Sequence, residues 1–335
     1  DRRGEMRIAA QRKAEMAKVF RVVIGLLHGA QRGHVDQLVE IGAAGLLLLV
    51  VFGLKAALLP LSLWLPALYG SAAASVAALF AILTKVGVYS IVRMVTLIFT
   101  DQGPAAEMVR TVLPVLGLMT LAAGSIGVLG SQRLRHLVAW LVVMSAGTLL
   151  TGIGQGNSKG MVAAFYYLPH TTWVTAGLFL LTDLIARQRG EQEDAVTKGP
   201  PLAQPALLGL LFFLGSVAAA GLPPLSGFVG KVLLLQSAAP GHAPWLWGMI
   251  LLSGLLSLIA FSRAGSRFFW ATEGESADGG KANWLRVVPT ALLLALSVAM
   301  TVGAAPISRY AELTAQQLLQ PALYRDAVLI AKEEP

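Results

Sequence analysis

The sequence predicts an all-α, polytopic membrane protein with about eight transmembrane helices, one or two of them broken. Of its 335 residues, 56% are hydrophobic and only 13% are charged, whereas a soluble domain carries about 25% charged residues. About eight apolar stretches reach the roughly 20 residues that a bilayer-spanning helix needs. Prolines and glycines interrupt two of these stretches next to a lysine, which predicts the breaks.

The elements follow from the apolar stretches in chain order. The expected spans are 41–63, 72–99, 108–130, 134–154, 160–186, 203–237, 245–269 and 285–305. Several exceed the required length, which indicates either a tilt or a break inside the span. We divide the chain into an atypical basic segment 1–40, a transmembrane domain 41–306 and an amphipathic tail 307–335 that lies on the surface.

Composition also excludes several functions. The net charge of +8 comes largely from Lys and Arg in short loops between apolar spans, a pattern that membrane topology requires, so we expect a lipid bilayer and no nucleic acid as partner. There is no cysteine, which rules out disulfides and thiolate metal sites. The five histidines include no pair at metal-ligand spacing, so neither a metal nor a cofactor is expected.

Counting basic residues on alternate sides of the spans predicts the orientation. The expected cytoplasmic side collects Arg133, Arg135, Arg187, Arg189, Lys198, Arg263, Arg267, Lys281 and Arg286. Residues 1–32 carry eight further Lys or Arg, yet alternation places them on the opposite side. They form either an unusual amphipathic arm or a stretch, 1–34, that is frameshifted or foreign in place of the natural N-terminus. We favour the second interpretation.

Three lysines lie inside apolar spans, namely Lys55, Lys85 and Lys231. Placing such a charge at bilayer depth costs about 2.5–3.5 kcal/mol or more, so each is a candidate functional residue. Low dielectric disfavours the charged form of a buried amine, which could therefore gain and lose a proton near neutral pH. The alternative is a lysine that reaches the headgroups or pairs permanently with a carboxylate.

The helix breaks support a functional interpretation of these lysines. Pro60 follows Lys55 by five residues, and Pro223 and Pro224 precede Lys231 by eight and seven. Non-helical backbone inside a membrane is tolerated only where it lines a polar cavity or is covered by protein. Transporters use such interrupted helices to place freed carbonyls and helix ends beside ions. Two broken helices with one lysine each suggest repeated units.

His170 is the fourth candidate, because it follows Pro169 in the middle of a span. Histidine titrates near neutrality and can pass protons between lysines. The alternative is a histidine that bonds to a helix carbonyl. On the same span, the hydroxyls of Thr171, Thr172 and Thr175 could hold ordered water or bond back to their own helix.

Four motifs resemble the antiporter-like subunits shared by Mrp/Pha-type cation/proton antiporters and respiratory complex I. They are FGLKAALLPLSLWLP, ALFAILTKVGVYSIVRM, FYYLPHTTWVTAGLFLLTDLI and AGLPPLSGFVGKVLLL. The resemblance runs from about residue 41 to the C-terminus. Among the branches, the chain is most similar to the D subunit of the multisubunit Mrp/Pha (Na+ or K+)/H+ antiporter, and YAELTAQQLLQPALY is also similar to that branch.

The resemblance implies a fold of 14 helices with two inverted five-helix repeats, of which this chain would hold the seventh to fourteenth helices. Lys55, Lys85 and Lys231 fall on the family's buried lysines, and His170 falls on its histidine position. The resemblance also implies that the family's first six helices would be missing from this chain, including one whose glutamate partners the lysine at position 55. Many complex I relatives carry a lysine where this chain has Thr175, which favours the Mrp/Pha side.

We therefore expect a proton-translocating subunit of a multisubunit monovalent cation/proton antiporter in the cell membrane, the inner membrane in bacteria. It would be a secondary transporter and no enzyme, and would assemble with other Mrp/Pha subunits to exchange H+ for Na+ or K+. Protons would pass along Lys85, His170 and Lys231, with Lys55 as the pivot. Two alternatives remain: a redox-driven pump subunit of complex I or a membrane-bound hydrogenase, and a truncated fragment that does not transport.

Overall fold

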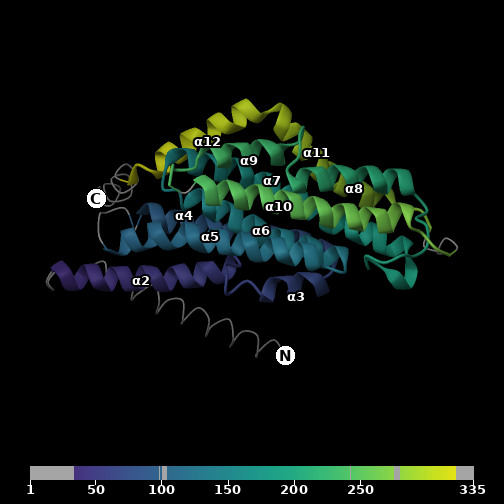
Figure 1. Ribbon diagram of the computed structural model, residues 1–335, viewed down its shortest axis with the longest axis horizontal. Coiled ribbons are helices and arrows are strands. Elements are labelled where there is room, and N and C mark those ends of the chain that lie inside the picture. Colours follow the sequence, from purple (N-terminus) through teal and green to yellow (C-terminus); the bar gives the residue numbers. More distant parts are fainter. Residues whose placement is uncertain (1–33, 98, 100–103, 242, 275–279, 322–335) are drawn as a thin grey trace, which may run out of the picture.

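A bundle of long helices makes up the chain, as a computed structural model shows (Figure 1). The structure describes residues 34–97, 99, 104–241, 243–274 and 280–321. These residues contain no β-strand, apart from an isolated bridge between Arg133 and Ala195. The helices are α2 His34–Lys55, α3 Trp64–Ser71, α4 Ala74–Leu97, α5 Pro104–Gly130, α6 Leu134–Ile153, α7 Ser158–Gln188, α8 Pro205–Ala220, α9 Ser226–Gln236, α10 Ala243–Gly265, α11 Trp284–Val302 and α12 Ala304–Leu318. Two short elements, η1 Gly190–Gln192 and the π-helical η2 Ser266–Trp270, complete the described set.

Five of these elements are long and apolar enough to cross a membrane. They are α4, the Val109–Gly130 part of α5, α6, α10 with η2, and α11. The expected count of eight is therefore not reached by single apolar helices. The fifth expected span is the 31-residue α7, which is less apolar because it carries His170 and several hydroxyls. The first expected span, 41–63, is the end of α2 and the break that follows it, and the sixth, 203–237, is the two shorter helices α8 and α9.

The centre of the bundle is α6, where nearly every residue is buried. Its sequence is apolar on all sides, as expected for a helix surrounded by protein. Helices α5 and α7 pack against α6, and α4 and α10 lie beside them. By contrast, the outer helices expose large apolar side chains such as Leu79, Leu251 and Leu292. An exposed apolar belt of this kind fits contact with lipid.

Glycine allows α5 and α6 to approach closely. A Cβ at Gly124 of α5 would lie 2.6 Å from the Cα of Met144 on α6, which is closer than real side chains come. Gly117 of α5 and Gly147 of α6 lie as close to the facing backbone. Small residues at an interface are the usual way in which membrane helices bring their backbones together.

The first break separates α2 from α3, as the sequence predicts. Helix α2 ends at Lys55, and Ala57 then takes a positive φ of 56°. The amide of Leu59 donates to Thr120 Oγ1 on α5 at 3.0 Å, so part of the interrupted backbone is satisfied by a neighbouring helix.

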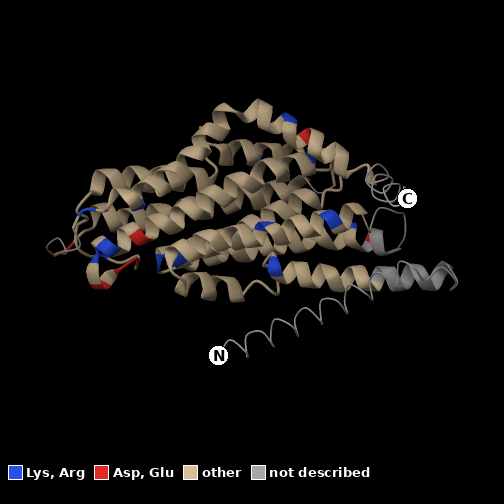
Figure 2. Cartoon of the chain, turned by 180° about the vertical axis from the view of Figure 1, so that it is seen from behind, with Lys and Arg blue, Asp and Glu red and all other residues tan. Residues whose placement is uncertain are grey.

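One end of the bundle, where α6 begins and α7 ends, carries a group of Lys and Arg residues together with several Asp and Glu residues (Figure 2). There, the segment after α7 folds over the start of α6: Asp194 accepts from Arg133 Nε at 2.9 Å and from the Arg135 amide at 2.8 Å. The charge of Asp194 raises the pKa of Arg133 above its usual value. The fully buried Arg189 donates to three carbonyls of this segment, and burial lowers the pKa of its guanidinium.

The chain's two ends are described only in part. Helix α12 runs over α7 and buries Ala311 and Ala315, while its outer side exposes Tyr310 and Leu313 (Figure 1). It begins at Ala304, before the expected tail. Residues 1–33 and 322–335, on which the interpretation of the N-terminal segment and most of the tail depend, lie outside the described residues.

Candidate functional site

The second break, between α8 and α9, is where the candidate site begins. Helix α8 ends at Ala220, and Gly221 takes the left-handed conformation with φ of 77°, which a glycine adopts without strain. Pro223 and Pro224 follow, and neither has an amide to continue the helix. The amides of Gly221 and Leu222 still bond to the Val217 and Ala218 carbonyls. The Ala220 carbonyl at the very end of α8 has no such backbone partner among the described residues, so a side chain from elsewhere can bind it.

Lys231 uses one of these freed carbonyls. Its side chain is 7% exposed, and Nζ donates to the Ala220 carbonyl at 2.6 Å. Two glycines leave the room for it: a Cβ at Gly221 would lie 2.6 Å from Lys231 Cδ, and one at Gly254 of α10 would lie 3.1 Å from Nζ. The broken helix thus folds its own lysine back onto its break, next to the negative end of the α8 dipole.

His170 lies on the other side of the same break. It is 1% exposed, and Nδ1 is 2.8 Å from the hydroxyl of Ser226, the first residue of α9. Pro169 does not interrupt α7, which runs through it. The Ala218 carbonyl of α8 also faces the imidazole beside Gly227, and Lys231 is near enough to act on His170 through its charge. The break therefore brings together His170 and Lys231, which are 61 residues apart.

Lys85 is buried separately, between α4 and α6. It is 4% exposed, and Nζ donates to Ser145 Oγ at 2.7 Å. The Ser145 hydroxyl in turn donates to the Val142 carbonyl at 2.7 Å, which directs its lone pairs toward the ammonium.

Polar side chains occupy the interval between Lys85 and His170. Thr148 lies one turn beyond Ser145 on α6, and the Tyr167 hydroxyl interacts with it. The Tyr167 ring then lies 5.3 Å from the His170 ring, measured between centroids. Lys85, Ser145, Thr148, Tyr167 and His170 thus form a succession of buried polar groups that runs to the break.

Neither buried ammonium is neutralised by a carboxylate. In the part of the chain that the structure describes, no ion pair involves Lys85 or Lys231, and the ion pairs there connect loop and helix-end residues. The alternative of a permanent lysine–carboxylate pair therefore does not apply among these residues. Likewise, no group of three His, Asp or Glu side chains within the described ranges could hold a metal ion.

Lys55 is not brought to this site. The structure places its side chain on the exposed outer face of α2, whereas the sequence predicts a buried lysine. It lies at the break between α2 and α3, and Gly87 of α4 packs against the Lys55–Ala56 backbone. The exposure arises because no described helix covers this face of α2. Leu47, Val50 and Leu54 are exposed there as well.

Several site residues were not found from the sequence. Ser145, Ser226 and Ser297 are such residues, and only Ser226 had a local signal, since it lies between the proline pair and Lys231. Among the threonines of α7, Thr172 and Thr175 bond back to their own helix, at 2.8 and 2.7 Å. For these two hydroxyls, the interpretation that they bond back to their own helix is therefore correct.

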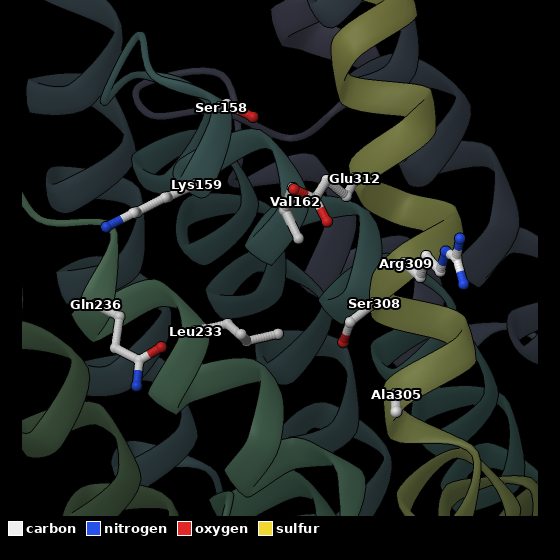
Figure 3. Close-up of a pocket in the computed structure, with 9 residues that line it drawn as sticks. All are labelled: Ser158, Lys159, Val162, Leu233, Gln236, Ala305, Ser308, Arg309 and Glu312. Atoms are coloured by element: carbon white, nitrogen blue, oxygen red, sulfur yellow. The ribbon is translucent and has the colours of Figure 1, made fainter.

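A separate cavity of about 760 Å³ opens near the start of α7 (Figure 3). It is lined by the start of α7, the end of α9 and α12, and it reaches α9 at Leu233, two residues after Lys231. Lys159 and Arg309 point in opposite directions from it (Figure 3), so the cavity does not gather two cations around one point.

Fold and site together define a class: a membrane protein of packed helices with titratable groups buried at an interrupted helix. The family model described as "NADH:quinone oxidoreductase/Mrp antiporter, TM" matches residues 20–257, more than half of the chain. The chain belongs to this family. The match begins inside the N-terminal segment 1–34.

Two relatives show which members the chain is similar to. It is 36% identical to the D subunit of a probable K(+)/H(+) antiporter of Rhizobium meliloti, covering 88% of this chain and 59% of the relative. It is 33% identical to the D subunit of a Na(+)/H(+) antiporter of Bacillus subtilis, covering 85% of this chain and 57% of the relative. The chain thus spans somewhat more than half the length of the relatives it matches.

Solved structures share the fold. A chain of the Mrp complex from Dietzia sp. DQ12-45-1b superposes with a TM-score of 0.77 at 22% identity, covering 93% of this chain and 67% of that one. A chain of respiratory complex I from Thermus thermophilus superposes with a TM-score of 0.66 at 24% identity, covering 85% and 62%. At sequence identities this low, the similarity shows a shared fold and no shared function.

Proposed function

We propose that this chain forms the proton-translocating part of the D subunit of a multisubunit monovalent cation/proton antiporter. Lys85, His170 and Lys231 relay protons, and the exchange is for Na+ or K+. The observation that carries this proposal is the pair of buried ammonium groups, each bound to an uncharged oxygen with no carboxylate partner among the described residues. Such amines can release a proton without leaving a buried unpaired carboxylate behind.

The finer assignments belong to the same proposal. The protein would lie in the cell membrane, the inner membrane in bacteria, as a secondary transporter assembled with other Mrp/Pha subunits. Residues 41–306 form the transporting domain, residues 1–40 and 307–335 flank it, and Lys55 is the pivot at the first break. The exposed face of α2 that carries Lys55 supports a further contact there. The relatives named as antiporter subunits support an antiporter rather than a redox-driven pump.

Substitution of Lys231 tests the relay. Lys231→Ala should abolish cation-driven proton movement, measured with a pH-sensitive dye in inside-out vesicles that hold the assembled complex. Lys231→Arg keeps the charge but cannot lose a proton, so it should fail as well. The matched control is Lys198→Ala, because Lys198 is half-exposed and pairs with Glu273 at the basic end.

The outcomes separate clearly if assembly is measured first, by co-purification of the other subunits. Full activity in Lys231→Ala would remove Lys231 from the relay. Full activity in Lys231→Arg alone would show that the site needs a positive charge and no proton exchange there, which would contradict the proposed mechanism.

A further inference from the structure

Two buried serines bond to each other instead of to their own helices, and one of them also bonds to His170. Ser226 Oγ lies 2.8 Å from His170 Nδ1 and 2.8 Å from Ser297 Oγ on α11. Ser226 is 0% exposed and Ser297 is 1% exposed. A serine inside a helix ordinarily bonds back to a carbonyl three or four residues earlier. Ser125, Ser216 and Ser253 of this chain do so.

Ser226 is the first residue of α9, and its hydroxyl contacts His170 instead of capping that helix. Serine near a helix start usually caps the helix by accepting from a backbone amide. Here the N-cap of α9 is Leu225, and no side-chain hydrogen bond caps the helix. The Ser226 hydroxyl is therefore committed to the imidazole and to Ser297.

The other ring nitrogen fixes the direction of the hydrogen bonds. His170 Nε2 and the Ala218 carbonyl oxygen face the same small space: a Cβ at Gly227 would contact both. The Ala218 carbonyl is thus the acceptor nearest to Nε2 on this side of the ring. A carbonyl can only accept, so a hydrogen bond between the two requires the hydrogen on Nε2. In the neutral ring Nδ1 then has a free lone pair, Ser226 donates to it, and Ser297 donates to Ser226.

We propose that Ser226 and Ser297 are positioning residues that keep His170 protonated at Nε2 and present Nδ1 as the atom that takes up and releases the relayed proton. The role of Nδ1 in proton transport rests on the proposed function, whereas the order of the hydrogen bonds does not. When a proton arrives, Nδ1–H becomes a donor and the Ser226 oxygen accepts from it. Ser226 then turns its own hydrogen to the Ser297 oxygen. When the proton leaves Nδ1, the order reverses, and each polar group has a partner in both states.

The first test reads the ring directly and needs no transport. The whole chain is labelled with 15N-histidine and reconstituted in lipid bilayers for solid-state NMR. His170 is identified by the signals that disappear in His170→Gln. We expect a protonated Nε2 and an unprotonated, hydrogen-bonded Nδ1. In Ser226→Ala the Nδ1 signal should move to the position of a nitrogen without a hydrogen bond, while Nε2 stays protonated.

The second test is cation-driven proton movement in vesicles that hold the assembled complex. Ser226→Ala should lower the rate about tenfold, the equivalent of one hydrogen bond to a charged group. Ser226→Thr keeps the hydroxyl and should restore most of the rate, and Ser297→Ala should be intermediate. Ser125→Ala is the matched control, because Ser125 is buried and bonds only to its own helix, and it should transport like the parent.

Three results would overturn the proposal. They are a proton on Nδ1 in the neutral parent ring, an Nδ1 signal that Ser226→Ala leaves unchanged, and an assembled Ser226→Thr variant as slow as Ser226→Ala. If the parent itself shows no cation-driven proton movement, the proposed function fails. The NMR result then still decides the hydrogen-bond order, so the two failures are distinguishable.

Discussion

Uncharged oxygens bind Lys85 and Lys231, the two lysines that are buried in the described part of the chain, and that choice of partner matters for a proton relay. A carboxylate at Lys85 or Lys231 would fix each amine in its charged form, because separating a buried pair leaves an unpaired charge. A serine hydroxyl or a freed carbonyl binds the ammonium and leaves no such charge when the proton departs. The partners seen here, Ser145 and Ala220, are therefore compatible with an amine that changes its protonation state.

Ser145 offers a test at the level of one hydrogen bond. Ser145→Ala removes the acceptor of the Lys85 ammonium and should lower cation-driven proton movement about tenfold. Ser145→Thr keeps the hydroxyl and should retain most of the rate. The measurement is the same vesicle assay, with co-purification of the other subunits as the check on assembly. A rate in Ser145→Ala equal to that of the parent would show that the Lys85–Ser145 bond does not serve transport.

Among the elements, the break between α8 and α9 contributes most to the site. One glycine with positive φ and two prolines end α8, the Ala220 carbonyl then binds Lys231 of α9, and the Ala218 carbonyl faces His170 of α7 beside Gly227. An unbroken helix would use these carbonyls for its own amides. The break therefore converts backbone into ligands inside the membrane, which is the setting in which such irregular backbone is tolerated.

The segment after α7 is a second element whose role can be tested. Asp194 is 1% exposed and holds the start of α6 through Arg133 and the Arg135 amide. Asp194→Ala should lower the free energy of unfolding by about 2 kcal/mol, because a helix N-terminus and a charged side chain lose their partner. Thermal unfolding of the detergent-solubilised complex measures the change.

The control for this substitution lies on the same segment. Glu191 is exposed, so Glu191→Ala should change the free energy of unfolding by no more than about 0.5 kcal/mol. If both variants unfolded at the same temperature as the parent, Asp194 would not stabilise the start of α6. An equal loss in both would indicate a general effect of charge on this segment.

At the scale of the whole molecule, charge is distributed unevenly between the two ends of the bundle. Arg135, Arg187 and Arg286 line one cavity of about 360 Å³ at the basic end, together with Asp183. Lys159 and Arg309 lie around the large cavity at the other end (Figure 3). The basic end is the expected cytoplasmic end, because short cytoplasmic loops carry the excess of Lys and Arg.

Single cysteines can test this orientation, since the chain has none of its own. Lys159→Cys should react in intact cells with a maleimide that does not cross the membrane. Lys198→Cys should react only after permeabilisation. Both positions are exposed, so access to the reagent decides the result. The reverse pattern would invert the topology and would contradict the assignment of the basic end to the cytoplasm.

The sequence by itself determined the class of protein, the existence of both breaks and three of the residues buried in the structure. These features are local: apolar length, Pro and Gly placement and a lysine within an apolar run can be read along one helix at a time. Lys85, His170 and Lys231 were found in this way, because a charged or titratable group in lipid has few explanations.

Only the tertiary structure decided how these groups are connected. Ser145, Ser226 and Ser297 come from three different helices, and serine is common in helices where it bonds only to its own backbone, so no local pattern distinguishes them. The exposure of Lys55 could not be predicted either, since burial depends on which helices pack against α2. The physical reason is the same in each case: hydropathy is a property of one segment, whereas hydrogen-bond partners and burial depend on the packing of several helices.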